Sequence, residues 1–428
     1  MKNRLIVLSV DALFYEDMEY MRKLPYFKEM IPQSSYAKGG MRSIYPSLTY
    51  PAHCTMITGA YPDKTGVFQN EVLDVNNPRP DWIWYRSDVK VGNVLTYAKK
   101  AGLTTACINW PTMAGDPDVD YLVPEIWGMK PDDDQYEIVA KYSSEKAIPI
   151  LKKHFHKWDH GNQPQHDFFM TDVAVDIIKQ GKPDVLFIHL TQLDHDRHVT
   201  GLYSHAVDQA LDIAAENFGR LVEATKDAGI YDETNFVVLG DHGQISVNKM
   251  LNPNIIFTQN GLIDIDEEGK VLDWKVWAMS AALSCQIILK DPDDAETRAK
   301  VEDILYDICK NEELGVESVL TAEECERDYH LTGNFQYVLE GRNTCFRSAC
   351  TGELVVGPDN TDYKFSIASH GHLPHKGAQP AFMCYGPAFR KGYTFSRREM
   401  VDQAPTYAKV LGIDLPEAQG TPILDILV

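Results

Sequence analysis

The sequence has few of the features that mark secreted or membrane proteins. Its 428 residues include only eight cysteines, none in a Cys-x-x-Cys pair, which is too sparse for a disulfide framework and predicts reduced thiols. Cys345 and Cys350, with Cys325 upstream, leave a bridge or metal site open, although their spacing matches no zinc pattern well. No run approaches the roughly 18 consecutive apolar residues that cross a bilayer, and the apolar run in the opening MKNRLIVLSVDAL is too short for a secretory signal. We therefore expect a cytoplasmic protein with no membrane partner.

Positive charge is scarce as well. Lys and Arg number 41 against 62 Asp and Glu, for a formal net charge of −21, which argues against a protein that binds nucleic-acid polymers or anionic membranes through charge. The 44% of hydrophobic residues supply enough material for a sizeable core. The length fits two or three average domains or one large α/β domain with an insertion. The sequence gives no indication of the oligomeric state.

Short apolar runs alternate with helical patterns along most of the chain. The runs lie at 5–10, 104–109, 185–190 and 236–239. They are continuous rather than alternating, which is typical of strands covered by helices on both faces. Between them, segments such as 203–228 carry apolar residues at intervals of three and four. This order predicts a doubly wound, mostly parallel α/β sheet.

The pattern loosens in the second half of the chain. From 252 to 362, acidic stretches surround an expected helix at 296–310, and we expect this part to form a smaller inserted cap. Residues 1–251 and 363–428 would then form the catalytic core. The segment DQAPTYAKVLGIDLP predicts a closing helix that is stopped by Gly412.

Potential metal ligands follow four of the predicted strands. They are Asp11 after LIVLSV, Asp194 at the end of VLFIHLTQLD, Asp241 at the end of FVVLGD, and His370 at the end of KFSIASH. The carboxyl ends of parallel strands meet at one edge of a sheet, so we expect these side chains to converge. His198 and His242 add two imidazoles beside them. Three Asp and three His suit two zinc sites of three ligands each, with manganese and iron as the alternative metals.

Each of these groups also has a plainer explanation when taken alone. An Asp after a strand often caps the next helix, Asp-His-Gly can form a turn, and Asp194 with His198 can be an exposed pair on a helix. Their joint occurrence at strand ends favours a paired metal centre.

The segment YPSLTYPAHCTMITGAYPDKTG offers a nucleophile for such a centre. Pro51 fits the first turn of a helix and Gly59 fits its end. Thr49 would then stand near the helix N-terminus, where unpaired N–H groups and the helix dipole favour an alkoxide and a phosphate oxygen. The alternative is that Thr49 or Ser47 simply caps the helix.

These motifs resemble the nucleotide pyrophosphatase/phosphodiesterases, or type I phosphodiesterases, of the alkaline phosphatase superfamily. The resemblance lies in VLSVDAL, YPSLTYPAHCTMITGAYPDKTGV, NEVLD, PDVLFIHLTQLDHDRHVTG, VVLGDHGQ and ASHGH, and the tail APTYAKVLGI is similar to the superfamily's closing helix. It implies an alkaline-phosphatase-like core around two metals. By this resemblance one zinc is held by Asp194, His198 and His370, and the other by Asp11, Asp241 and His242.

The resemblance also implies roles for three residues near the predicted nucleophile. Thr49 falls on the family's nucleophile, which also coordinates the second metal. Asn70 falls on the asparagine that helps to hold a nonbridging phosphate oxygen, and Tyr50 on a residue that stacks against a nucleobase. Trp127 and Tyr142 are the candidates for a second stacking aromatic. A turn asparagine and ordinary aromatic packing remain the alternatives.

The activity implied is hydrolysis of phosphodiester or pyrophosphate bonds in nucleotide-type substrates through a covalent threonyl-phosphate intermediate. A phosphonate hydrolase of the phosphonoacetate type and a phosphomonoesterase are the alternatives, and a non-catalytic metal-binding module is the least favoured. Four further groups lie near the ligands in sequence: His195, Asp196, His372 and His375. We expect them to surround the ligands or face solvent rather than bind a third metal.

Overall fold

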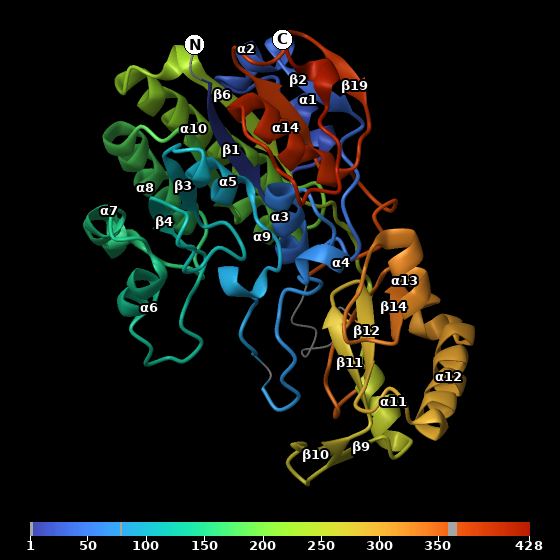
Figure 1. The fold of residues 1–428 in the computed structure, drawn as a ribbon. Coiled ribbons are helices and arrows are strands. Elements are labelled where there is room, and N and C mark those ends of the chain that lie inside the picture. The colour runs from blue at the N-terminus through green and yellow to red at the C-terminus, as the bar shows by residue number, and fades with distance from the viewer. Residues whose placement is uncertain (1–2, 78, 358–365) are drawn as a thin grey trace.

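The core of the chain is one large sheet. The computed structural model describes residues 3–77, 79–357 and 366–428, and its eight-stranded sheet has the order β19-β2-β18-β6-β1-β5-β3-β4 (Figure 1). All of these strands except β18 run in one direction. The strands are β1 (Arg4–Val10), β2 (Ser35–Lys38), β3 (Thr105–Ile108), β4 (Tyr121–Val123), β5 (Val185–Leu190), β6 (Thr234–Leu239), β18 (Phe382–Tyr385) and β19 (Thr394–Ser396). The predicted mostly parallel α/β sheet is confirmed.

Helices cover both faces of this sheet, which explains why its strands read as continuous apolar runs. In β1, Ile6 and Leu8 pack into a core with residues of α8 and α10, whereas Leu5 and Val7 point to the opposite core with α3, α5 and α14. These helices are α3 (Thr49–Thr58), α5 (Val94–Lys100), α8 (Gln165–Gly181), α10 (His205–Asp227) and α14 (Gln403–Leu411). The helix expected at 203–228 therefore corresponds to α10. The closing helix α14 ends as expected at Gly412, which has φ +68°.

Shorter helices connect these layers. They are α1 (Met18–Met21), α2 (Phe27–Met30), α4 (Pro62–Thr65), α6 (Gln135–Tyr142), α7 (Ile148–His154) and α9 (Gln192–Thr200). Of these, α9 directly follows the central strand β5.

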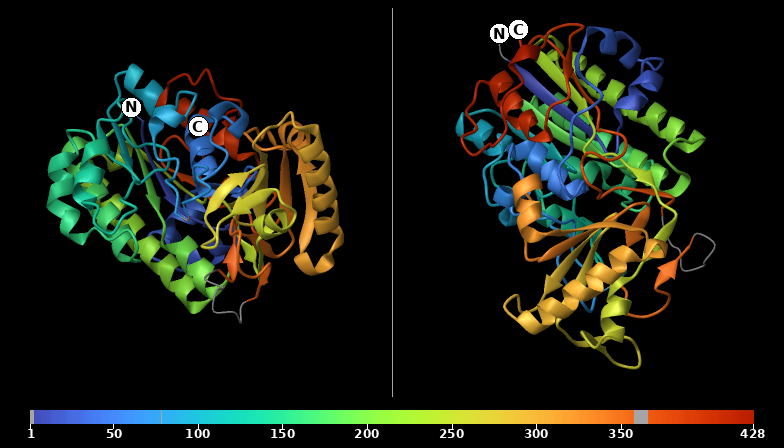
Figure 2. Two further views of the ribbon diagram at one scale, coloured as in Figure 1. Left: turned by 90° about the horizontal axis from the view of Figure 1, so that it is seen from below. Right: turned by 90° about the vertical axis from the view of Figure 1, so that its right-hand side faces the viewer.

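A second hydrophobic core is built mainly from the segment of the chain that runs from β7 (Ile245–Ser246) to β17 (Ala368–Ser369). Its antiparallel sheet, in the order β11-β12-β14-β13, packs with α11 and α12. Both chain ends lie at the end of the core away from this insertion (Figures 1 and 2). The cap boundaries at 252 and 362 stay a prediction, and the second boundary lies outside the described residues.

The elements of this region are short apart from α12, which matches the helix expected at 296–310. Its helices are α11 (Pro253–Gln259), α12 (Ala295–Lys310) and α13 (Ala322–Tyr329). Its strands are β7 (Ile245–Ser246), β8 (Lys249–Leu251), β9 (Ile263–Ile265), β10 (Val271–Trp274), β11 (Val276–Ala281), β12 (Ser284–Leu289), β13 (Val316–Thr321), β14 (Tyr337–Gly341), β15 (Thr344–Phe346), β16 (Val355–Val356) and β17 (Ala368–Ser369).

The cysteines are all free. None of the eight takes part in a disulfide, so the bridge left open for Cys345 and Cys350 does not form. The groups of potential metal ligands that the described residues bring together contain no cysteine. Both results agree with the expectation of reduced thiols.

A buried carboxylate joins the insertion to the core. Glu340 of β14 accepts hydrogen bonds from the Tyr45 hydroxyl at 3.1 Å, the Leu373 N–H at 3.0 Å and the Lys376 ammonium at 2.9 Å. The residue is fully buried. Burial raises the pKa of its carboxyl from 4.5 to about 7, although Lys376 opposes the shift.

This shift predicts a pH dependence of stability. The folded chain keeps a proton on Glu340 that the unfolded chain releases, so the free energy of unfolding should decrease as pH rises from about 4.5 to 7, by up to roughly 3 kcal/mol from this group. Glu340→Gln should therefore show a shallower decrease in urea unfolding experiments across this range. Glu317→Gln, which removes the other carboxylate bound to Lys376, should keep the wild-type slope because Glu340 is still present. Equal slopes for all three proteins would contradict the prediction.

Candidate active site

All six expected ligand side chains meet at the carboxyl edge of three neighbouring strands. Asp11 follows β1, α9 after β5 carries Asp194 and His198, and β6 leads to Asp241 and His242. Since β6, β1 and β5 are adjacent in the sheet, their ends deliver these groups to one place. His370 differs from its expected position, because it follows β17, which pairs with β7 rather than with the central sheet.

We call Asp194, His198 and His370 the first cradle, and Asp11, Asp241 and His242 the second cradle. In the first, Asp194 lies 3.1 Å from Nε2 of His198 and 3.9 Å from Nε2 of His370. In the second, Nε2 of His242 lies 3.3 Å from Asp11 and 3.2 Å from Asp241. These short separations place Asp11, Asp241 and His242 around one small volume, and they bring Asp194 close to both His198 and His370.

His242 borders both cradles. Its ring stacks on that of His370 with centroids 3.8 Å apart. Two groups of three ligand atoms lie within 4.8 Å of one another: Asp194, His242 and His370, and Asp11, Asp241 and His242. The six side chains thus form a continuous set, and the assignment of His198 to the first cradle stays a prediction.

The donor set fits divalent cations. Oδ1 of Asp11, Oδ2 of Asp241 and Nδ1 of His242 are buried without a hydrogen-bond partner. Unpaired buried carboxylate oxygens are costly unless a cation or donor compensates them.

The outer atoms of the same ligands are held by their surroundings. Oδ1 of Asp241 accepts from the Ala12 N–H at 3.0 Å, and Oδ2 of Asp11 lies 3.2 Å from Nε2 of His189. The Nδ1 atoms of His198 and His370 lie 2.7 and 3.1 Å from the backbone carbonyl oxygens of Ala368 and Ser47. Such contacts orient metal ligands and leave their other atoms directed at the ion.

The protonation preferences of these groups point the same way. Burial raises the pKa of Asp11 to about 7 and, with the nearby Asp11 carboxylate, raises that of Asp241 well above its usual range. Burial lowers the pKa of His370 to about 4 and that of His242 well below its usual value. The imidazoles of His242 and His370 therefore favour the neutral form that metal ligands need, and the carboxylates of Asp11 and Asp241 are not fully compensated by positive charge. Burial alone would lower the pKa of His198, but the Asp194 carboxylate raises it above its usual value.

Asp194 behaves differently from the other two carboxylates. Burial alone would raise its pKa, but the imidazoles of His198 and His370 hold it below its usual range. Nε2 of Gln244 also donates a hydrogen bond to its Oδ1 at 2.5 Å. The first cradle thus contains a carboxylate that is already held in its charged form.

Thr49 lies beside the second cradle. It is the first residue of α3, which ends at Gly59 as expected, and its Oγ1 is 3.2 Å from Nε2 of His242. The capping alternative is not observed. Leu48 occupies the N-cap position without a side-chain cap, and the Ser47 hydroxyl donates to the carbonyl oxygen of His372 instead.

Asn70 lies next to the N-terminus of α3. Its Oδ1 accepts a hydrogen bond from the Tyr50 N–H at 3.0 Å, and its carbonyl oxygen accepts one from the Ile83 N–H at 2.8 Å. The first contact identifies which end of the amide is the acceptor. The Nδ2 donor is therefore the end that remains for a substrate oxygen.

The expected stacking role of Tyr50 stays a prediction. The side chain is fully buried among other aromatic residues. Trp82 packs against it with centroids 5.1 Å apart, and Trp127 packs against Trp82 at 5.3 Å. Trp127 also stacks on His160 at 3.9 Å. Tyr142 instead contacts Tyr85. Tyr50, whose N–H is bound to Asn70, is thus the first of a row of aromatic side chains that continues through Trp82 to Trp127.

Sequence reasoning missed several residues of this neighbourhood. His189 and Gln244 contact ligands, and Trp82 contacts Tyr50. A polar His189 inside the apolar run VLFIHL and the aromatic stretch DWIWY were the available signals.

The four additional groups lie outside the two cradles. Asp196 accepts a hydrogen bond from Gln192, and the buried His372 has its Nδ1 2.9 Å from the carbonyl oxygen of Leu373. His195 and His375 are exposed. None belongs to a group of potential metal ligands among the described residues.

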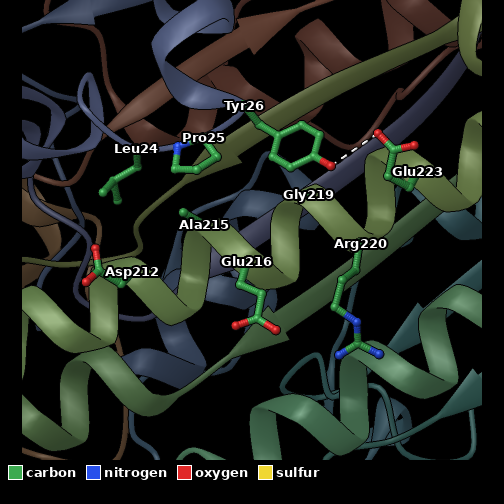
Figure 3. A pocket seen from close by; sticks show the side chains of 9 residues that line it. All are labelled: Leu24, Pro25, Tyr26, Asp212, Ala215, Glu216, Gly219, Arg220 and Glu223. Carbon is green, nitrogen blue, oxygen red and sulfur yellow. Dashed lines mark hydrogen bonds between the residues drawn. The ribbon is translucent and has the colours of Figure 1, made fainter.

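Two surface hollows lie along α10 and contain none of the expected site residues. The first, of about 460 Å³, is formed by the turn at Leu24 to Tyr26 and one side of α10, where the Tyr26 hydroxyl donates to Glu223 (Figure 3). The second, of about 610 Å³, shares Arg220 with it. They are separate from the carboxyl edge that gathers the cradles.

Comparison with known proteins agrees with this arrangement. Residues 5–372 match the family described as type I phosphodiesterase / nucleotide pyrophosphatase. The chain belongs to this family. Ectonucleotide pyrophosphatase/phosphodiesterase family member 3 of Mus musculus is 27% identical over 250 residues, which cover 56% of this chain and 24% of that protein. A venom phosphodiesterase of Macrovipera lebetinus is 25% identical over 262 residues, covering 58% and 26%.

The fold is shared with solved members of the family. Murine ectonucleotide pyrophosphatase/phosphodiesterase 5 superposes with a TM-score of 0.68 at 16% identity, covering all of both chains. An inactive form of the same murine protein in complex with AMP gives 0.69 at 16% identity. This chain spans about a quarter of the length of the curated relatives named above. Among its described helices, none has the length and apolar character to cross a bilayer.

Removal of a cradle imidazole should weaken metal binding. We expect His370→Asn to bind zinc at least about tenfold more weakly than the wild type, because replacement even of groups that only orient a ligand costs that much. His195→Asn is the matched control, since His195 is exposed on α9 and should leave the affinity unchanged. Zinc titration with a competing chelator measures both. An unchanged affinity in His370→Asn would exclude this residue as a ligand.

Proposed function

We propose that this chain hydrolyses phosphodiester or pyrophosphate bonds in nucleotide-type substrates, with the Thr49 hydroxyl as the nucleophile. The position of Thr49 carries the proposal, because its Oγ1 lies 3.2 Å from His242 at the start of α3. Family membership supports the reaction class. Relatives carry the names of nucleotide pyrophosphatases and phosphodiesterases, and one structural neighbour is in complex with AMP.

We further propose that the two cradles hold two divalent cations, with zinc as the first expectation and manganese or iron as alternatives. When bound, such cations would lower the pKa of the threonine hydroxyl and offset negative charge on phosphate oxygens. The unpartnered oxygens of Asp11 and Asp241 support this assignment. Thr49 is the proposed additional ligand of the second cradle.

The chain's own groups contribute to attack at phosphorus. No side chain caps the N-terminus of α3, so the positive end of the helix dipole remains available to the Thr49 oxygen and to a phosphate oxygen. The Nδ2 of Asn70 is oriented as a second donor by the contact of its Oδ1 with Tyr50. Attack forms a threonyl-phosphate ester as the leaving oxygen departs, and water then cleaves the ester and restores the hydroxyl.

The charge of the site favours a diester over a monoester. Two dications balance three carboxylates and one alkoxide when the imidazoles are neutral, which leaves no surplus positive charge for a phosphate dianion. Arg197 lies between the ligands Asp194 and His198 in sequence, but its side chain is fully buried. It pairs with Asp17 at 2.5 Å in the protein interior, so it is not available to a substrate.

We also propose a cytoplasmic location and a small phosphate ester as the partner, without a nucleic-acid polymer or membrane. Eight free cysteines support a reducing compartment. Cell fractionation tests the location.

Replacement of the nucleophile tests the function directly. Thr49→Ala should lower kcat for a p-nitrophenyl phosphodiester at least about a thousandfold, because loss of a nucleophile removes the covalent route. Thr55→Ala, a buried threonine of the same helix, is the control and should retain activity. The metal content of both variants should be measured alongside. Wild-type turnover by a metal-loaded Thr49→Ala protein would refute the proposal.

A substrate panel separates the remaining activities. Dinucleotides and p-nitrophenyl phosphodiesters should be hydrolysed faster than p-nitrophenyl phosphate or phosphonoacetate. A preference for phosphonoacetate would instead identify a phosphonate hydrolase, and a preference for the monoester a phosphomonoesterase. A protein that turns over none of them with zinc or manganese supplied would fit the non-catalytic alternative.

A further inference from the structure

We propose that Gln69 is a positioning residue that ties Asn70 to the β11–β12 hairpin of the insertion. The inference rests on the role of Asn70 proposed above. Oε1 of Gln69 accepts a hydrogen bond from the Asn70 N–H at 2.9 Å, and its Nε2 donates to the carbonyl oxygen of Ser280 at 3.0 Å. The residue is 3% exposed. The side chain of Gln69 therefore links Asn70, the proposed phosphate-binding residue, to the end of β11.

A second glutamine holds the same segment from the other strand of the hairpin. Nε2 of Gln286, in β12, donates to the carbonyl oxygen of Phe68 at 3.0 Å, and Gln286 is 1% exposed. The backbone just before Asn70 is thus fixed to the hairpin at two points, from β11 and from β12. Both contacts are buried, where competition from water is weak.

The turn of this hairpin also touches the first cradle. The Leu283 N–H donates to the carbonyl oxygen of His370 at 3.0 Å. A Cβ added at Gly371, which has φ +85°, would lie 2.0 Å from the carbonyl oxygen of Ala281, so only glycine allows this approach. The hairpin therefore contacts the chain beside Asn70 and beside His370, and its placement sets the distance between these two parts of the site.

Gln69 is one of three supports of Asn70. The others are the Tyr50 N–H bound to its side chain and the Ile83 N–H bound to its carbonyl oxygen. Loss of Gln69 leaves those two contacts in place, so the amide should be displaced rather than lost. Small displacements of a group that contacts the reacting atoms can reduce turnover by up to about a hundredfold. A partial effect, of about tenfold in kcat, is expected here.

The experiment compares two glutamines that each form a hydrogen bond with the backbone of the β11–β12 hairpin. Gln69→Leu removes both hydrogen bonds at similar volume. Gln336→Leu is the matched control, because Oε1 of Gln336 accepts from the Leu289 N–H at 2.6 Å at the opposite end of β12. With a p-nitrophenyl phosphodiester, Gln69→Leu should lower kcat about tenfold with KM and bound metal within about twofold of wild type. Gln336→Leu should retain the wild-type kcat. Gln69→Met replaces Gln69→Leu if the latter does not fold.

A readout independent of turnover follows from the same contact. The Asn70 amide loses its acceptor in Gln69→Leu, so hydrogen exchange at this amide should become faster in the metal-loaded protein. Exchange there should be unchanged in Gln336→Leu. Wild-type exchange in the Gln69 variant would overturn the inference.

A double-mutant cycle decides whether Gln69 acts through Asn70. In an Asn70→Ala background, Gln69→Leu should change kcat by less than about twofold, because the group it positions is gone. A full tenfold effect in that background, or an unchanged kcat in Gln69→Leu alone, would overturn the inference. Failure of the proposed function is a separate result, since it would appear as a wild-type protein without phosphodiesterase activity or a fully active Thr49→Ala protein.

Discussion

The concentration of three carboxylates and three imidazoles in one buried volume is the constraint that the surrounding structure satisfies. Burial raises the pKa of Asp11 and Asp241, so these groups need compensation from nearby positive charge. Part of it comes from inside the protein. Although burial alone would lower the pKa of His189, the carboxylates of Asp11 and Glu125 raise it well above its usual value. Oδ1 of Asp11 and Oδ2 of Asp241, which have no hydrogen-bond partner, are suited to bind a cation that would supply the remaining positive charge.

Helix α9 presents candidate ligands to the site on one face and is anchored in the protein interior by the other. Asp194 and His198 lie one turn apart and face each other at 3.1 Å, whereas Arg197 between them points into the interior. There its guanidinium pairs with Asp17 and lies 3.7 Å from the Phe14 ring. Breaking such a buried pair leaves an uncompensated charge, which strongly disfavours any shift of the helix. The same pair also keeps the Arg197 side chain away from a substrate.

Local sequence patterns were sufficient for the layers of the fold and for the candidate ligands. Apolar runs identify buried strands such as β5, and the carboxylates that follow within four residues of each run, Asp11, Asp194 and Asp241, mark the sheet edge where they meet. Contacts between distant segments were not predictable in this way. The link from Gln69 to Ser280 spans 211 residues, and the burial of Tyr50 depends on Trp82 from a separate loop. His370 was placed on a strand of the main sheet, but the two-residue β17 pairs with β7, a partner that no local pattern identifies.

The insertion lies between His242 and His370 in the sequence, and so it separates the last cradle residue from the other five. Five of the six cradle residues lie between positions 11 and 242, and the entire second sheet precedes the sixth, His370. The carbonyl oxygen of His370 accepts a hydrogen bond from the Leu283 N–H of the insertion, and its ring Nδ1 lies 3.1 Å from the carbonyl oxygen of Ser47 in the core. A growing polypeptide can therefore complete the second cradle as soon as β6 has joined β1, but the first must wait until the whole insertion has emerged and docked. The order of the elements along the chain therefore lets the second cradle form before the first.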